Sequence, residues 1–140
     1  MEKITYTAEG VTMPPIDQAR VNRWIEQVAR LHQRTLGPIA YVFCDDETIL
    51  RVNRQFLNHD FFTDIITFDY SRRSMISGDM YISLDTVRSN AEMLGQPYER
   101  ELHRVIIHGI LHLCGIDDKG PGEREIMERN EEEALAIYEI

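Results

Sequence analysis

The sequence predicts a single α+β domain with a mixed sheet of about four strands packed against helices. The chain has 140 residues, enough for one hydrophobic core, and its 43% apolar and 28% charged content is typical of a globular protein. Strand-like and helix-like segments follow in the order strand, helix, strand, helix, two strands, three helices. Paired strands before a run of helices favour an α+β layer over an alternating parallel fold. No repeat or linker divides residues 1–140, so we expect one domain.

The first two elements are a strand and a helix. Residues 3–8 alternate apolar and polar side chains, which predicts a strand. Residues 17–35 predict a helix that Gly37 and Pro38 end. Its apolar residues recur at helical spacing and are expected to be buried; they are Val21, Trp24, Ile25, Val28 and Leu31.

A second strand and helix follow. Residues 39–44 form a short apolar run that predicts a strand. Asp45 or Asp46 is expected to cap the next helix, since a carboxylate accepts hydrogen bonds from the first free amides. On that helix, the apolar residues that share a face are Ile49, Val52 and Phe56.

Two strands then lead into three helices. Residues 64–70 are β-branched and aromatic, which predicts a strand, and residues 79–84 predict another, with a loop at 72–78 between them. Asp85 is expected to cap a helix that ends at Gly95.

The last two helices are expected at about 97–114 and 123–138. Pro97 opens the first of these, which we expect to be central and, with the first helix of the chain, to cover the sheet. The apolar residues expected to be buried on the last helix are Ile126, Met127, Ala134, Leu135 and Ile137.

Charge and cysteine content limit the classes of partner. Fifteen basic and twenty-four acidic residues give a net charge of −9, which disfavours nonspecific attraction to DNA, RNA or acidic membranes. No apolar run is long enough to span a bilayer, and the opening residues lack the pattern of a signal peptide. Cys44 and Cys114 do not make a disulfide framework. We therefore expect a cytoplasmic protein without membrane or DNA partners.

The segment that most directly indicates a chemical function is HGILHLCGIDD, residues 108–118. His108 and His112 are four residues apart, so on a helix they lie on one face, one turn apart. Gly115 lets the chain turn back, which can deliver Asp117 or Asp118 to the same point. Two imidazoles and one carboxylate leave an open position on a metal ion, as in catalytic zinc sites.

Neighbouring residues test this interpretation against a simpler one, a hydrogen-bonded histidine pair capped by acids. His103 is rotated about 140° from the ligand face, so we expect it at the surface or beside the ligands. Cys114 is also rotated away and is expected to be a small buried residue, with a role as thiolate ligand as the minor alternative. Gly109 stands where zinc peptidases of the HExxH kind carry their glutamate base, which argues against that mechanism. A metal could still activate water or polarise a phosphoryl oxygen.

On these residues the chain resembles the YbeY family of rRNA maturation factors. The family signature is H-G-x-L-H-L-x-G-x-D-H, and only the last residue differs here. Residues 57–68, LNHDFFTDIITF, are similar to the family's D-x-x-T-[DN]-V-L-S-F segment, and residues 78–83, GDMYIS, to its G-D-I-x-I-S strand. The three motifs occur in family order, and the match runs from about Asp45 to the end.

The resemblance implies an α+β fold, one bound zinc ion or another divalent transition metal, and a site whose metal ligands are His108, His112 and Asp118. Asp118 stands where the family has a third histidine. A carboxylate there lowers the charge of the metal centre, so we expect a less acidic bound water and more tolerance for manganese or iron. Asp117 is expected to orient a ligand from beside the metal.

A second departure concerns phosphate contact. Where many family members carry an arginine before the D-x-x-T segment, this chain has Leu57. Arg54, one turn earlier, is a weak candidate to contact phosphate instead, as is His59. The alternative is that Arg54 is an ordinary solvated helix residue. No residue is assigned as general base.

The leading function that the resemblance implies is a single-strand-specific, zinc-dependent endoribonuclease. Its expected roles are 3′-end maturation of 16S rRNA and ribosome quality control, with ribosomal RNA and the ribosome as partners. One alternative is a non-catalytic zinc-binding factor associated with the ribosome, which Leu57 and the net charge favour. Another is a metal-dependent hydrolase of a different substrate.

Overall fold

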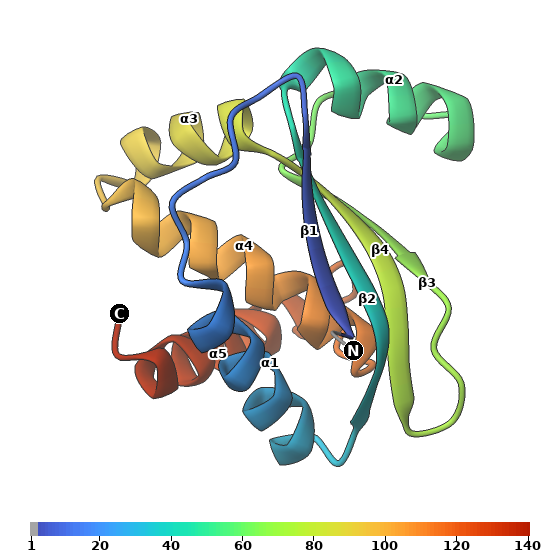
Figure 1. Ribbon diagram of the computed structural model, residues 1–140, viewed down its shortest axis with the longest axis vertical. Coiled ribbons are helices and arrows are strands. Elements are labelled where there is room, and N and C mark those ends of the chain that lie inside the picture. Colours follow the sequence, from blue (N-terminus) through green and yellow to red (C-terminus); the bar gives the residue numbers. More distant parts are fainter. Residues whose placement is uncertain (1–2) are drawn as a thin grey trace.

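A computed structural model describes residues 3–140 and has the expected α+β architecture (Figure 1). One sheet contains the four strands in the order β1-β2-β4-β3. β1 (Ile4–Glu9), β2 (Thr35–Cys44) and β4 (Met75–Ser83) run parallel to one another. β3 (Ile65–Asp69) is an edge strand antiparallel to β4. The predicted four-stranded mixed sheet is therefore confirmed.

The helices surround this sheet unequally. α1 (Gln18–Leu31) and α4 (Tyr98–Leu113) lie on one face, and α5 (Glu123–Tyr138) packs on both of them (Figure 1). α2 (Asp46–Leu57) contacts β3 and β4, and α3 (Leu84–Leu94) packs on α4. Within residues 3–140, no helix combines the length and apolar character that crossing a membrane requires.

The main core lies between the sheet and α4, which fixes the position of that helix. Tyr41, Met80 and Ile82 of the strands are fully buried, as are Ile106 and Ile110 of α4. The Tyr41 hydroxyl donates a hydrogen bond of 2.8 Å to the backbone carbonyl of Ile106. A smaller apolar cluster lies between α2 and the sheet and contains Cys44, Ile49, Val52 and Ile66.

The loop expected at 72–78 is shorter than predicted, because β4 already begins at Met75. Met75 pairs with Thr35 of β2, and Gly78 pairs with Asp69 of β3. A Cβ on Gly78 would lie 2.5 Å from the Phe68 carbonyl oxygen. The glycine therefore marks a close approach of two strands rather than the loop that its composition indicated.

Two helix boundaries also differ from expectation. Ser83, not Asp85, caps α3, and its hydroxyl accepts from the Thr86 amide at 3.3 Å. Asp85 instead accepts from the Asp46 amide at 3.0 Å, which joins α3 to the start of α2. α1 ends at Leu31 rather than near residue 35, because Thr35 already pairs with β4.

Most expected core residues are buried, and the exceptions lie at helix ends. Leu31 and Phe56 are on the last turns of α1 and α2 and are 62% and 60% exposed. Ile126, on the first turn of α5, is 44% exposed. A terminal turn has neighbours on fewer sides, so apolar spacing alone overestimates burial there.

Candidate metal centre and its cleft

The end of α4 and the turn after it bring three potential metal ligands together. The His108 and His112 rings lie 4.6 Å apart, and their Nε2 atoms are 3.4 and 3.6 Å from Oδ2 of Asp118. Gly115 has φ +93°, the left-handed conformation that lets the chain turn back towards the helix. One ligand atom from each of the three residues lies within 4.8 Å of the others. Of the two acids that the spacing left open, Asp118 joins the histidines.

The chemistry of this donor set fits a divalent transition metal. Imidazole nitrogens and a carboxylate oxygen are the ligands of catalytic zinc sites with three protein donors. Burial and the neighbouring His108 lower the pKa of His112, against the opposing charges of Asp118 and Asp117. The neutral imidazole is the form that binds a metal. Asp117 lines the same cleft, and its charge acts on His112.

A buried carboxylate holds His108 from the side away from Asp118. Nδ1 of His108 lies 2.5 Å from Oε2 of Glu131, a residue of α5 that is 3% exposed. An ionised carboxylate can only accept, so Nδ1 donates, and in the neutral imidazole the lone pair then lies on Nε2, the nitrogen on the side of Asp118. A carboxylate on the outer nitrogen orients a ligating histidine and increases its basicity.

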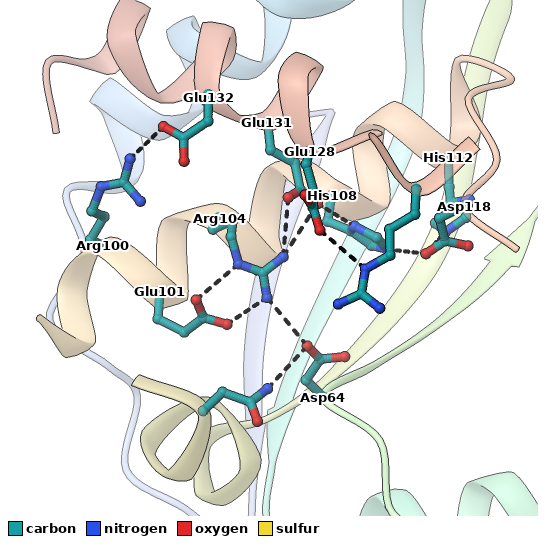
Figure 2. A network of polar contacts seen from close by, with 12 residues as sticks. Asp64, Arg100, Glu101, Arg104, His108, His112, Asp118, Glu128, Glu131 and Glu132 are labelled. Carbon is teal, nitrogen blue, oxygen red and sulfur yellow. Dashed lines mark hydrogen bonds and ion pairs between the residues drawn. The ribbon is translucent and has the colours of Figure 1, made fainter. Parts of the chain in front are cut away.

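Arg104 extends this support into a buried network (Figure 2). Its guanidinium donates to Glu101 at 2.5 and 2.9 Å and to Glu131 at 3.2 and 3.3 Å, and it lies 3.6 Å from Asp64. Burial opposes the charge on Arg104, but the carboxylates outweigh it and raise its pKa. Burial raises the pKa of Asp64, and the positive charge of Arg104 partly offsets this effect. Glu131 thus accepts hydrogen bonds from both Arg104 and His108.

Sequence reasoning missed this network. Glu131 lies in an acidic run that is typical of a solvated helix face. The sequence does not connect it with His108, which lies 23 residues earlier. A weaker signal was present on α4. Glu101, Arg104 and His108 lie at intervals of three and four residues, which places them on one face of the helix.

Gly109 has a packing role that explains why no glutamate follows His108. A Cβ at this position would lie 2.2 Å from Sδ of Met80 and 3.0 Å from Cδ1 of Ile65. Met80 is fully buried, so its side chain cannot move into solvent. A side chain at position 109 would therefore require the buried Met80 and its neighbour Ile65 to shift.

The three candidate ligands lie in a cleft of about 410 Å³. Its walls come from β3, from the segment between α2 and β3, and from the turn after α4. The polar and apolar side chains of its lining include His108, His112, Asp117, Asp118 and Lys119 from α4 and the turn after it, and Leu57, His59, Phe61, Asp64 and Asp69 from α2, β3 and the segment between them.

The residues considered for phosphate contact lie in two different places. Leu57 and His59 line the cleft. Arg54 does not; it lies in a separate depression with Glu47 and Arg51, and its Nε donates to Asp60. Arg54 is thus not brought to the candidate metal ligands.

His103 is buried, which corrects its expected place at the surface or beside the ligands. It is 1% exposed and packs against the rings of Trp24 and Tyr138, with centroids 6.0 and 4.6 Å away. Its Nδ1 lies 2.6 Å from the Glu99 carbonyl oxygen, and burial lowers the pKa of its imidazole. The side chain of His103 points away from the ligand face of α4 and contacts α1 and α5. This contact cannot be deduced from the geometry of α4 alone.

Both cysteines are buried and unpaired, as expected of small core residues. Burial raises the pKa of Cys114 to about 11 and that of Cys44 to about 12. Thiols with such pKa values are almost fully protonated at neutral pH, and a metal ligand needs the thiolate. Neither cysteine lines the cleft among the described residues.

Comparisons with known proteins agree over nearly the whole chain. The family model described as endoribonuclease YbeY matches residues 7–139. A Phocaeicola vulgatus protein named endoribonuclease YbeY is 63% identical over 137 residues, 98% of this chain and 99% of the relative. A Bacteroides thetaiotaomicron protein of the same name is 62% identical over 134 residues, 96% of this chain and 98% of the relative.

A solved structure supports the fold. The solution structure of a Thermotoga maritima protein matches with a TM-score of 0.63 at 24% sequence identity. The match covers 97% of this chain and 91% of that protein. At this identity the likeness supports a shared architecture.

Proposed function

The chain belongs to the YbeY family of endoribonucleases, and from this membership we propose that it is a metal-dependent endoribonuclease that acts in ribosomal RNA processing. The observation that carries the proposal is the group of His108, His112 and Asp118 in an accessible cleft. A closed set of four ligands would favour a structural ion, whereas three protein ligands leave a position for the reaction.

Neighbouring side chains favour binding of a cation by these three residues. Glu131 keeps the proton of His108 on Nδ1, so Nε2 is free to bind a cation. Burial and the neighbouring His108 lower the pKa of His112, which favours the neutral ring, and an Asp118 oxygen lies 3.4 and 3.6 Å from the two Nε2 atoms. A divalent ion held by these three residues would supply Lewis-acid activation of the phosphodiester and of water.

Zinc is the ion that we propose, with His108, His112 and Asp118 as its ligands and Asp117 beside them. Two imidazoles and a carboxylate suit zinc, and the carboxylate in place of a third histidine also suits manganese or iron. Metal analysis of the purified protein and of Asp118→Ala tests the ligand set. Unchanged metal content in Asp118→Ala would remove Asp118 from it.

The substrate that we propose is single-stranded RNA at the 3′ end of 16S rRNA, which makes the ribosome a partner and the cytoplasm the site of action. The names of the relatives support RNA as the substrate class. Two unpaired cysteines are compatible with a reducing compartment.

Cleavage of defined RNA tests the function. Purified protein with quantified metal is incubated with single-stranded and structured fragments of the rRNA 3′ end, beside His112→Ala. We expect the wild-type protein to cleave the single-stranded fragment and the variant to lose this activity. Equal trace cleavage by both proteins would indicate a contaminating nuclease and would contradict the proposal.

A non-catalytic RNA-binding factor is the second candidate. The observation that favours it is Leu57, which lines the cleft where many family members carry an arginine. This candidate predicts that wild-type protein binds the rRNA fragment without cleaving it at any metal concentration. The cleavage experiment therefore separates the two functions.

A further inference from the structure

Apolar and aromatic side chains from the end of α2 and the segment that follows it line part of the cleft. Leu57, His59 and Phe61 line this part, and we call them the aromatic rim. The His59 and Phe61 rings are stacked, with centroids 5.1 Å apart and planes inclined by 21°. Phe61 is 54% exposed, and the adjacent Phe62 is 56% exposed. Single exposed apolar side chains are ordinary, but a cluster at a cleft marks a binding surface.

The backbone that carries the rim is anchored to α2. The buried Asn53 side chain donates from Nδ2 to the carbonyl of Phe61 at 2.9 Å. The His59 amide donates to the carbonyl of Asn53 at 3.1 Å, and Arg54 pairs with Asp60 in the same segment. The rings are therefore exposed on a segment whose position is already determined, which reduces the entropy that a ligand must remove.

Charge in the cleft argues against recognition through phosphates. Four carboxylates line it, those of Asp64, Asp69, Asp117 and Asp118. Lys119 is the only lysine or arginine among the described residues of this lining. Affinity that comes from neutralised phosphates needs several basic side chains. Little of the binding free energy for a nucleic acid can come from that source here.

We propose that the aromatic rim binds an unpaired base of the RNA by stacking on Phe61, in place of an arginine–phosphate contact at position 57. This inference rests on the proposed function for the identity of the ligand. Stacking on aromatic side chains is a common way to hold single-stranded RNA, and it requires bases that are free of pairing. The rim thus selects single strands through the ring face of Phe61, while the metal site in the same cleft holds the scissile phosphodiester.

A double-mutant cycle between protein and RNA tests the inference. The probe is a short, fluorescein-labelled, single-stranded 2′-O-methyl oligoribonucleotide, checked on a gel for integrity and measured by fluorescence anisotropy with metal-loaded protein. We expect Phe61→Ala to raise the Kd by about 5- to 150-fold and Phe61→Tyr to preserve it. Tyr70→Ala is the matched control, because Tyr70 is equally exposed at 56% but does not line the cleft, and its Kd should be unchanged.

The second arm of the cycle replaces successive nucleotides of the probe by abasic residues. At one position the abasic residue should weaken binding to the wild-type protein and have little further effect on Phe61→Ala. Additive losses at every position would overturn the inference, as would an unchanged Kd for Phe61→Ala or no measurable binding by the wild-type protein. We also expect log K to fall with log salt with a slope of about −0.7 or shallower, the value for one phosphate contact on a single strand. A much steeper slope would indicate phosphate recognition and would contradict the proposal.

Cleavage measured in parallel separates this inference from the proposed function. Binding that depends on Phe61 without any cleavage would support the rim and overturn the nuclease. Cleavage with a KM that Phe61→Ala leaves unchanged would support the nuclease and overturn the rim.

Discussion

The two nitrogens of His108 face two different environments. On the Nδ1 side lie the buried Glu131 and the half-buried Arg104, which are joined by hydrogen bonds and ion pairs. On the Nε2 side lie Asp118 and the cleft, and Nε2 is 3.4 Å from a carboxylate oxygen of Asp118. One side of the ring is saturated with protein partners, and the other keeps a lone pair available.

Residues on the Nδ1 side orient the imidazole, whereas the Nε2 side is available to bind a ligand. A buried carboxylate without a partner is costly, so Glu131 has to retain both Arg104 and His108. The cleft side holds several acids close to two imidazoles, an arrangement that a cation would stabilise. We therefore expect substitutions on the inner side to affect folding and metal affinity, and those on the outer side to affect binding and cleavage. Four predictions test this division, from the largest effect to the smallest.

Replacing either histidine should abolish the metal site, but only one replacement should also weaken the fold. His108→Leu and His112→Leu should each lose bound metal and all detectable cleavage. With a chelator present, His108→Leu should in addition lower the free energy of unfolding by about 1–3 kcal/mol, because Glu131 loses the donor that Nδ1 of His108 provides. Metal analysis and urea denaturation measure the two effects. Equal stability of the two variants would show that the inner side does not depend on His108.

Removing the cation from the inner side should affect stability more than any surface change. Arg104→Met leaves Glu101 and Glu131 buried without a compensating charge, and the free energy of unfolding should fall by about 3–5 kcal/mol. Arg100→Met is the control, because Arg100 pairs with the exposed Glu132, and a pair of this kind contributes about 0–1 kcal/mol. Similar urea midpoints for the two variants would contradict the importance of the network.

Glu131→Gln should weaken the metal site without removing a ligand. An amide is a weaker acceptor than a carboxylate, and loss of such a partner typically lowers metal affinity by about 10- to 100-fold. Cleavage should fall at limiting metal and recover when metal is added in excess. Glu128→Gln, on the same helix but paired with the exposed Arg124, is the control and should titrate like the wild-type protein. Identical metal titrations for both variants would remove Glu131 from the site.

Arg54→Ala should have the smallest effect. Arg54 pairs with Asp60 at the surface and lies outside the cleft, so we expect unchanged RNA binding and cleavage. Exposed ion pairs of this kind contribute about 0–1 kcal/mol to stability. A selective rise in KM, measured with the rRNA fragment, would restore Arg54 as a phosphate contact.

The sequence predicted the fold class and the ligand face of α4 because both follow from local spacing. The four-residue spacing of His108 and His112, followed by a glycine that ends the helix, can be interpreted without knowledge of the rest of the chain. Glu131 could not be predicted in this way, because its contact with His108 depends on how α5 packs on α4. The early start of β4 at Met75 was missed for a related reason, since strand pairing outweighs the loop tendency of residues 72–78. Long-range contacts thus account for both misses.

The contact between Gly109 and Met80 has a consequence for the evolution of this scaffold. A glutamate at position 109, as in an HExxH peptidase, would place its Cβ 2.2 Å from Sδ of Met80, so this fully buried side chain would have to shift or be replaced as well. Close packing beneath the site therefore makes the peptidase arrangement difficult to reach by a single substitution.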